Sequence, residues 1–327
     1  MSKASYVQCQ LCPRKCVLAP GERGNCRVRI NYQGELVTLV YGKPCAVHKD
    51  PIEKKPMFHF LPGTYAFSIA TAGCNLHCKF CQNWEISQVN PEETNNIDLS
   101  PQMVVEYSFQ TACQSIAYTY SEPIIFYEYT YDTCVLARKA GLKNVLVTAG
   151  YINEKPLRKL CQVLDGANVD LKGFTEDYYR EVCSGTLEPV LRTLKIMTEM
   201  GVMVEVTNLI VPTLNDDFDL IKKMCDWLLE NLGPEYPLHF SRFFPRFQLR
   251  SLPPTPIETL IRAREIALKQ GLYYVYIGNV LIEGAENTYC PNCKKLLIER
   301  KGYWVGEMNI KEGKCKFCGT KIKGVWS

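Results

Sequence analysis

The sequence predicts an α/β protein built on a partial (β/α)6 TIM-like barrel, with a small Cys-rich N-terminal lobe before it and a zinc ribbon after it. Three observations lead to this prediction. Apolar strand-like runs alternate with helix-like segments between residues 64 and 280, as in repeated β–α units with a parallel sheet. Six or seven such units are too few for a closed eight-unit barrel, which takes about 250 residues. Finally, 11 of the 17 cysteines fall into three tight groups, which lie before, within and after these units.

The composition is that of a globular protein and gives no electrostatic reason to expect nucleic acid or a membrane as partner. Hydrophobic residues make up 46% of the 327 and charged residues 22%, and the formal net charge is 38 − 34 = +4. So small an excess does not create a strongly basic surface. The start, MSKASYVQCQ, lacks the apolar core of a signal peptide, and no apolar run is long enough to span a bilayer. We therefore expect a cytoplasmic protein, whose clustered cysteines bind metal rather than form disulfides.

Residues 1–60 are predicted to form a small metal-stapled lobe. Turn signals such as LAPGERGNC interrupt it, and RVRINYQGELVTLVYG predicts a hairpin. Cys9, Cys12, Cys16 and Cys26 supply four thiols within 18 residues. Zinc and an auxiliary [4Fe-4S] cluster both fit four thiolates, and we prefer zinc.

Residues 61–282 are predicted to form the barrel. The helical segments DLIKKMCDWLLENLG and PIETLIRAREIALKQG each end on Gly, as helices commonly do. Functional side chains should lie at the carboxyl ends of the strands, where the βα loops meet. The predicted strands are TYAFSIATAG, SIAYTY, NVLVTAG, ANVDLKG, VMVEVTNLIV, PLHFSRFFP and LYYVYIGNV.

A loop with three cysteines, TAGCNLHCKFCQNW, follows the first predicted strand. Cys74, Cys78 and Cys81 give it the spacing Cys-x3-Cys-x2-Cys. Iron–sulfur clusters are normally held by one Cys thiolate per iron, so three thiolates leave one iron of a [4Fe-4S] cluster open. An open coordination position is typical of a catalytic metal rather than a structural one. The alternative is a zinc knuckle that shares ligands with another cysteine group.

This loop resembles the signature of the radical SAM superfamily, in which Phe80 matches an aromatic residue that packs near the adenine. The resemblance implies a [4Fe-4S] cluster whose open iron binds S-adenosylmethionine (SAM), and reductive cleavage of SAM to a 5′-deoxyadenosyl radical that abstracts hydrogen. GCNLHCKFCQNWEIS, YTYSEP and VDLKGF together resemble activating enzymes of glycyl-radical proteins. With CQLCPRKC, KDPIEKKPMFHFLPG, VTNLIVPTLND and HFSRFFP, the chain is most similar to the radical SAM family of the AmmeMemoRadiSam system.

The same resemblance implies roles for individual residues. Ser121, Glu122 and Pro123 stand in the place of a Gly-Gly-Glu motif, so that Glu122 would accept the SAM amino group. Asp170 and Lys172 match an Asp-Leu-Lys motif near the SAM carboxylate or the reacting centre. The further cofactor contacts that it suggests are Thr148, Asn208 and Asn215.

Each of these residues also has an ordinary structural interpretation. Glu122 could be a turn carboxylate, and Asp170 a loop residue that caps a helix. Val147 and Ala149 stand where the family has Asp and Asn, which departs from its pattern. His239 and Arg242, in HFSRFFPRF, are candidates for substrate contacts, because an arginine binds a carboxylate or phosphate with two hydrogen bonds; the alternative is a solvated arginine on an ordinary strand.

The tail, residues 283–327, contains CPNC and CKFC. Cys290, Cys293, Cys315 and Cys318 form Cys-x2-Cys-x21-Cys-x2-Cys, the pattern of a closed tetrahedral zinc ribbon. We therefore expect this zinc site to stabilise the tail or to dock a partner.

Together these features predict a radical SAM enzyme of the activating-enzyme type, with a protein glycine, a small metabolite or RNA as substrate. The partners that the resemblance implies are an electron donor such as ferredoxin or flavodoxin, and Memo-like and AMMECR-like proteins. The alternative of another class is a multi-zinc module that binds protein or nucleic acid and performs no chemistry. That module would need a basic face, which the near-neutral charge does not favour.

Overall fold

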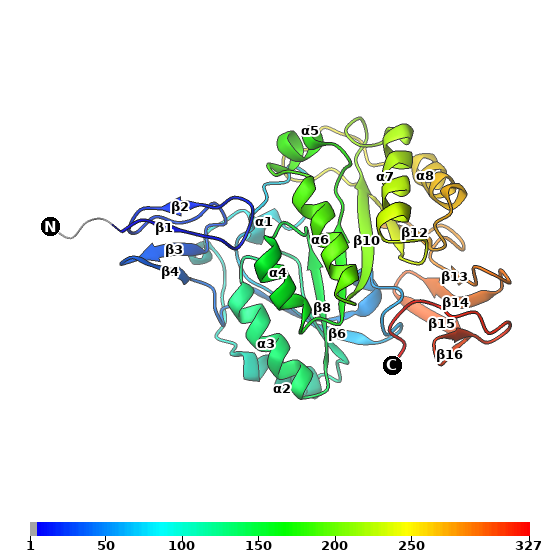
Figure 1. Cartoon of the computed structure of the whole chain (residues 1–327), viewed down its shortest axis with the longest axis horizontal. Helices are drawn as coiled ribbons and strands as arrows, with labels where there is room; N and C mark the ends of the chain where they lie inside the picture. Colours follow the sequence, from blue (N-terminus) through cyan, green and yellow to red (C-terminus); the bar gives the residue numbers. More distant parts are fainter. Residues whose placement is uncertain (1–4) are drawn as a thin grey trace.

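An eight-stranded sheet forms the centre of the computed structural model, which describes residues 5–327 (Figure 1). Seven strands run parallel in chain order from β6 to β12, and β5 pairs antiparallel with β6 at one edge. Because β5 and β12 are the two ends of the strand order, the sheet is open rather than closed. The strands are β5 (Ala46–Pro51), β6 (Tyr65–Ala70), β7 (Ser115–Tyr118), β8 (Lys143–Thr148), β9 (Gly166–Asp170), β10 (Met203–Ile210), β11 (Leu238–Arg242) and β12 (Val275–Gly278).

The parallel strands are the seven predicted runs, and helices connect them as six β–α units. Helix α8 is capped at its carboxyl end by Gly271, whose φ of +115° is left-handed. The glycine at the end of this segment predicted that the helix stops here. Helix α7 begins at the cap Asp217, whose side chain accepts hydrogen bonds from two backbone N–H groups. The helices are α1 (Trp84–Ser87), α2 (Pro101–Gln110), α3 (Tyr127–Lys139), α4 (Glu154–Cys161), α5 (Glu176–Tyr178), α6 (Glu188–Glu199), α7 (Phe218–Asn231) and α8 (Ile257–Gln270). None of them is both long and apolar enough to cross a bilayer, as far as the described part of the chain extends.

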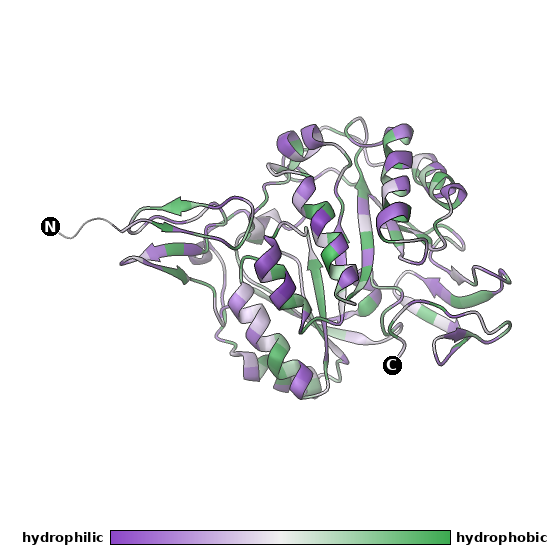
Figure 2. Cartoon of the chain, in the orientation of Figure 1, coloured by the Kyte–Doolittle hydropathy of each residue, from purple (hydrophilic) through white to green (hydrophobic). Residues whose placement is uncertain are grey.

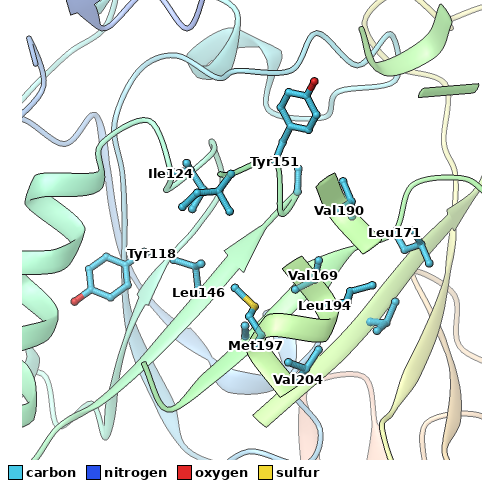
Figure 3. Close-up of a cluster of buried hydrophobic side chains, with 14 of the residues drawn as sticks. Tyr118, Ile124, Leu146, Tyr151, Val169, Leu171, Val190, Leu194, Met197 and Val204 are labelled. Atoms are coloured by element: carbon cyan, nitrogen blue, oxygen red, sulfur yellow. The ribbon is translucent and has the colours of Figure 1, made fainter. Parts of the chain in front are cut away.

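The main core lies between the sheet and these helices. Leu146, Val169 and Val204 come from adjacent strands and pack with Leu194 and Met197 of α6 (Figure 3). Such two-sided burial explains why the central strands are almost continuously apolar, while α4 in front of them shows mainly hydrophilic residues (Figure 2).

The other face of the sheet is closed at its amino end by the segment between β5 and β6. Met57 and Phe60 pack there against Ala117, Val145 and Met203. This plug forms the floor of the sheet and leaves its carboxyl end for the loops that carry the cysteines.

The N-terminal lobe contains the expected hairpin, β3 (Arg29–Tyr32) and β4 (Glu35–Thr38). Its turn residues Gln33 and Gly34 have φ values of +53° and +91°, the left-handed conformations that a two-residue hairpin turn requires. A second, shorter pair is β1 (Val7–Gln8) with β2 (Val17–Leu18). The sheet already begins at Ala46, so β5 lies before the predicted lobe boundary at residue 60, and that boundary stays a prediction.

The tail lies at the opposite end of the molecule from the lobe (Figure 1). Its strands are β13 (Thr288–Tyr289), β14 (Leu296–Lys301), β15 (Trp304–Met308), β16 (Ile310–Lys311) and β17 (Lys314–Cys315).

The tail docks on the floor of the sheet through a buried polar network. Arg300 donates from Nη1 to Oγ1 of Thr288 (2.7 Å), which lies 2.8 Å from the Tyr276 hydroxyl. That hydroxyl lies 2.7 Å from Nε2 of His59, whose Nδ1 lies 2.8 Å from the Lys323 carbonyl. The last residues of the chain therefore complete hydrogen bonds that the floor needs.

Candidate active site

The three-cysteine loop leaves the carboxyl end of β6, where the fold predicts functional groups. Gly73 starts the loop with φ +92°. A Cβ atom on Gly73 would lie 2.4 Å from the carbonyl oxygen of Cys26 and 2.7 Å from Val28. Glycine is therefore required at position 73 for two reasons: its left-handed backbone conformation and the close approach of the N-terminal lobe.

The thiols of this loop are buried together but do not converge on one point. Cys78 is 8% exposed, and Cys74 and Cys81 are partly buried. Burial raises the pKa of Cys74 and of Cys81 above the usual value of a thiol. A hydrogen bond with Cys183 lowers the pKa of Cys78, and the burial of Cys78 acts in the opposite direction.

Glu122 follows β7 and is 3% exposed. Thr148, at the end of β8, donates from Oγ1 to its Oε1 (2.5 Å), and the backbone N–H of Ala149 donates to its Oε2 (2.7 Å). Burial raises the pKa of Glu122, although these donors oppose the rise. Its carboxylate acts on Cys74 electrostatically, so the predicted amino-group acceptor lies beside the cysteine loop. Thr148 was predicted as a cofactor contact, and its hydroxyl orients Glu122.

Asp170 and Lys172, at the end of β9, form an ion pair with an Nζ to Oδ2 distance of 2.7 Å. Lys172 also lies over the ring of Phe80, 5.7 Å from its centroid. Burial lowers the pKa of Lys172, but the charges of Asp170 and of Cys78 outweigh it and raise the pKa well above its usual value. A charged lysine therefore lies among the residues predicted for the cofactor.

The two predicted contacts in and after β10, Asn208 and Asn215, differ in how their amides are paired. Asn208 is 3% exposed; its Nδ2 donates to the Leu171 carbonyl, and its Oδ1 is buried without a partner. It lines a small cavity of about 20 Å³ with Phe174 and Tyr178. The amide of Asn215 already makes three hydrogen bonds to the backbone, so it holds the loop together.

The two residues predicted on β11 lie apart from this group. His239 is 3% exposed, and its Nε2 lies 2.7 Å from Oε2 of the fully buried Glu205, in the floor of the sheet. Arg242 is half-buried; its Nε donates to the Thr255 carbonyl (2.8 Å), and its guanidinium lies over Phe244. A substrate role for either residue stays a prediction.

The two remaining cysteine groups differ in how close their sulfur atoms lie to one another. In the tail, Sγ of Cys290 lies 3.6 Å from Sγ of Cys318, and Sγ of Cys293 lies 3.7 Å from Sγ of Cys315. All four sulfur atoms lie within 4.8 Å of one another, as around a single metal ion. The N-terminal thiols are not gathered in this way and instead line a small cavity of about 20 Å³; they are Cys9, Cys12, Cys16 and Cys26.

Cys183 lies outside the three cysteine groups but is a neighbour of the site. It ends the π-helical turn Tyr179–Cys183, and its carbonyl accepts a hydrogen bond from His77 N–H inside the cysteine loop. Its loop-like context in the sequence is compatible with a chemical role, but a lone cysteine does not predict this position.

Comparisons with known proteins agree with this geometry. The family model of the radical SAM superfamily matches residues 68–228, which span the cysteine loop and the strands that carry Glu122 and Asp170. The chain belongs to the radical SAM superfamily. It is 49% identical over 318 residues to an uncharacterized protein of Methanocaldococcus jannaschii, covering 97% of this chain and 95% of that protein.

A more distant relative has a named activity. The chain is 24% identical to the pyruvate formate-lyase-activating enzyme of Clostridium pasteurianum over 163 residues, 49% of this chain and 67% of that enzyme. Among solved structures, it resembles a radical SAM methyltransferase from Sphaerobacter thermophilus, with a TM-score of 0.52, 13% identity and 67% of each chain covered. Streptococcus suis SuiB bound to precursor peptide SuiA gives a TM-score of 0.52 at 12% identity, covering 70% of this chain and 51% of SuiB. These two structural likenesses concern the fold alone.

The radical SAM family implies a [4Fe-4S] cluster and SAM, and the residues present fit both. Cys74, Cys78 and Cys81 are soft thiol donors whose sulfur atoms are not drawn together as around one ion. The unpartnered Oδ1 of Asn208 is a polar group that a bound cofactor would satisfy.

Proposed function

We propose that this protein cleaves SAM reductively and abstracts a hydrogen atom from a protein substrate, in the manner of glycyl-radical activating enzymes. One observation carries the proposal: the cysteine loop, Glu122 and the Asp170–Lys172 pair meet at one end of the sheet. When bound, the reduced cluster supplies one electron to the SAM sulfonium, which gives methionine and the 5′-deoxyadenosyl radical.

The side chains of the chain bind and orient the cofactor in this proposal. Cys74, Cys78 and Cys81 would hold the cluster through three thiolates and would leave it one open iron for SAM. The Glu122 carboxylate would accept a hydrogen bond from the SAM ammonium group. Thr148 keeps the Glu122 carboxylate in one orientation, because its hydroxyl donates a 2.5 Å hydrogen bond to Oε1. Asn208 offers its unpartnered Oδ1 as an acceptor.

Lys172 and Phe80 complete the cofactor site on its other side. Lys172 remains protonated beside Asp170 and offers an ammonium group to a carboxylate. Phe80 is 7% exposed and packs near Tyr178, where the adenine would stack.

The likeness to the pyruvate formate-lyase-activating enzyme supports a protein glycine as the substrate class. The half-buried Arg242 at the end of β11 is proposed to hold a carboxylate of that substrate. His239 is also proposed to act on the substrate, from the floor beside Glu205. Asn215 is proposed to support the cofactor through the loop that it holds together.

Further assignments rest on the same family resemblance. A low-potential donor such as ferredoxin or flavodoxin would reduce the cluster, and the enzyme would work in the cytoplasm. The tail thiols, 3.6–3.7 Å apart, are proposed to hold zinc, since a Zn–S distance of about 2.3 Å places tetrahedral sulfur atoms roughly 3.8 Å apart. Memo-like and AMMECR-like proteins are proposed as functional partners.

The test is anaerobic reconstitution with iron and sulfide, followed by SAM and dithionite, with 5′-deoxyadenosine measured by mass spectrometry. The wild type should form the nucleoside, and a variant with Cys74→Ala, Cys78→Ala and Cys81→Ala should not. Cys161→Ala, which removes a buried thiol outside all three groups, is the matched control and should remain active. Deuterated candidate substrates then identify the hydrogen donor by label transfer. Absence of nucleoside, with zinc in place of iron at the loop, would refute the proposal.

A further inference from the structure

The N-terminal cysteine group does not have the geometry of a single-ion site. Within residues 5–327, the tail cysteines are the one set of three or more potential ligand atoms that all lie within 4.8 Å of one another. Cys9, Cys12, Cys16 and Cys26 therefore behave like the cysteine loop of the radical SAM site and unlike the tail. Because a cubane cluster has an iron at each of four corners, its cysteine sulfurs lie further apart than those around one ion.

The four thiols surround a space rather than filling it. All of them line one small cavity of about 20 Å³, together with Arg29, Asn75 and Ile125. A single zinc ion would draw the four sulfur atoms close together, as in the tail, whereas a four-iron cluster needs them to stay apart, as they are here.

The walls of this cavity carry polar groups suited to an anionic cluster. Arg29 is 5% exposed, and its Nε is buried without a partner, while its Nη2 pairs with Glu128 at 2.5 Å. Hydrogen bonds to cluster sulfurs and nearby charge are the features with which proteins adjust cluster potentials.

The position of the cavity also bears on which metal group these thiols bind. Asn75, which lines it, directly follows the cluster ligand Cys74, and the Cys26 carbonyl lies against Gly73 on the other side of that ligand. Arg14 joins the two sites, since its Nε donates to the Asn75 carbonyl at 2.5 Å. A metal that only stapled the lobe would need no wall from the barrel, but this site is built against the loop that holds the first cluster.

We propose that Cys9, Cys12, Cys16 and Cys26 bind a second, fully ligated [4Fe-4S] cluster that passes electrons to the SAM-binding cluster. This reverses the preference for zinc at these thiols that their sequence spacing suggested. One electron from a low-potential external donor reduces the second cluster, and its transfer to the first cluster returns the second to the oxidised state. The presence of the cluster is independent of the proposed reaction, and only its role as a relay rests on that reaction.

Metal counting on the wild type tests the assignment without any substitution. Native mass spectrometry of the anaerobically reconstituted full chain should show two cubane clusters and one zinc ion. One cluster with two zinc ions would overturn the assignment. The variant with Cys74→Ala, Cys78→Ala and Cys81→Ala should keep half of the iron and all of the zinc. If it keeps no iron, the N-terminal site does not bind a cluster.

A spectroscopic measurement tests the proximity of the two clusters. In the dithionite-reduced wild type, the electron paramagnetic resonance signal should be broadened by coupling between two neighbouring paramagnetic clusters. The variant lacking Cys74, Cys78 and Cys81 should give the sharper signal of one isolated cluster. An unbroadened wild-type signal that is the sum of two independent clusters would overturn the relay. Loss of 5′-deoxyadenosine formation with both clusters intact would instead count against the proposed reaction.

Discussion

The buried imidazole of His59 makes a quantitative prediction about acid stability. Its Nδ1 faces the Lys323 carbonyl, which only accepts, so Nδ1 carries the proton and Nε2 accepts from the Tyr276 hydroxyl. The imidazole is therefore held neutral, and complete burial lowers the pKa of His59 from 6.5 to about 4, despite the opposing charge of Glu205.

The sign of the pH effect follows from this lowered pKa. Between pH 4 and 6.5 the unfolded chain binds a proton at His59 that the folded chain does not. The stability that depends on neutral His59 is therefore fully present above about pH 6.5. Below that pH the free energy of unfolding falls by about 1.4 kcal/mol per pH unit, and the total loss is roughly 3 kcal/mol.

His59→Gln is the matched variant, because its amide can donate to the Lys323 carbonyl and accept from Tyr276 without titrating. Anaerobic urea unfolding, followed by tryptophan fluorescence at about pH 7.5 and about pH 5.5, should show the wild type losing about 1.4 kcal/mol more than His59→Gln. Both proteins carry the same metals, so acid effects on the metal sites cancel in the difference. If the two proteins lose equal free energy, the neutral, buried imidazole does not control acid stability.

Three further predictions concern the site and the tail. Gly73→Ala should reduce iron content and destabilise the fold by several kcal/mol, whereas Gly201→Ala, with φ +80° and no atom within 4 Å of the new Cβ, should cost only about 1 kcal/mol; equal melting temperatures for the two would show that the lobe does not press on Gly73. Thr148→Val removes the hydroxyl that orients Glu122 and should weaken SAM binding roughly tenfold, as measured by calorimetry on the reconstituted enzyme; unchanged affinity would contradict the orienting role. Cys318→Ser should release zinc to a chromogenic chelator and lower the melting temperature, with iron retained; iron loss instead would place a cluster in the tail.

Much of the fold and of the cofactor site could be predicted from the sequence. The seven parallel strands follow from their apolar runs, because strands covered on both faces leave little else in their composition. Cys74, Glu122 and Asp170 come together because each follows a strand of the same parallel sheet, and the carboxyl ends of such strands share one edge. Chain position accounts for their proximity, whereas their roles as cofactor contacts come from the family resemblance and stay a prediction.

Other features depend on depth and packing, which a sequence pattern does not contain. The polar run of β5, with His48, Lys49 and Asp50, shows no strand alternation, and its pairing with β6 comes from the sheet edge that it covers. The pattern of β11 shows on which face of the sheet His239 lies but not how deep it lies, and Glu205 holds it in the floor. The N-terminal cysteines have a spacing compatible with two metals, and the space between their sulfurs distinguishes the two.

The floor network also bears on how the protein is made. His59 and Phe58 belong to the segment that plugs the sheet, yet their partners Lys323 and Arg300 follow 264 and 242 residues later in the chain. A nascent chain that has completed β12 therefore still exposes the apolar and polar groups that the tail covers, and it gains these buried hydrogen bonds only after the tail has been made. Chains that stop before the tail would thus expose the underside of the sheet to proteases.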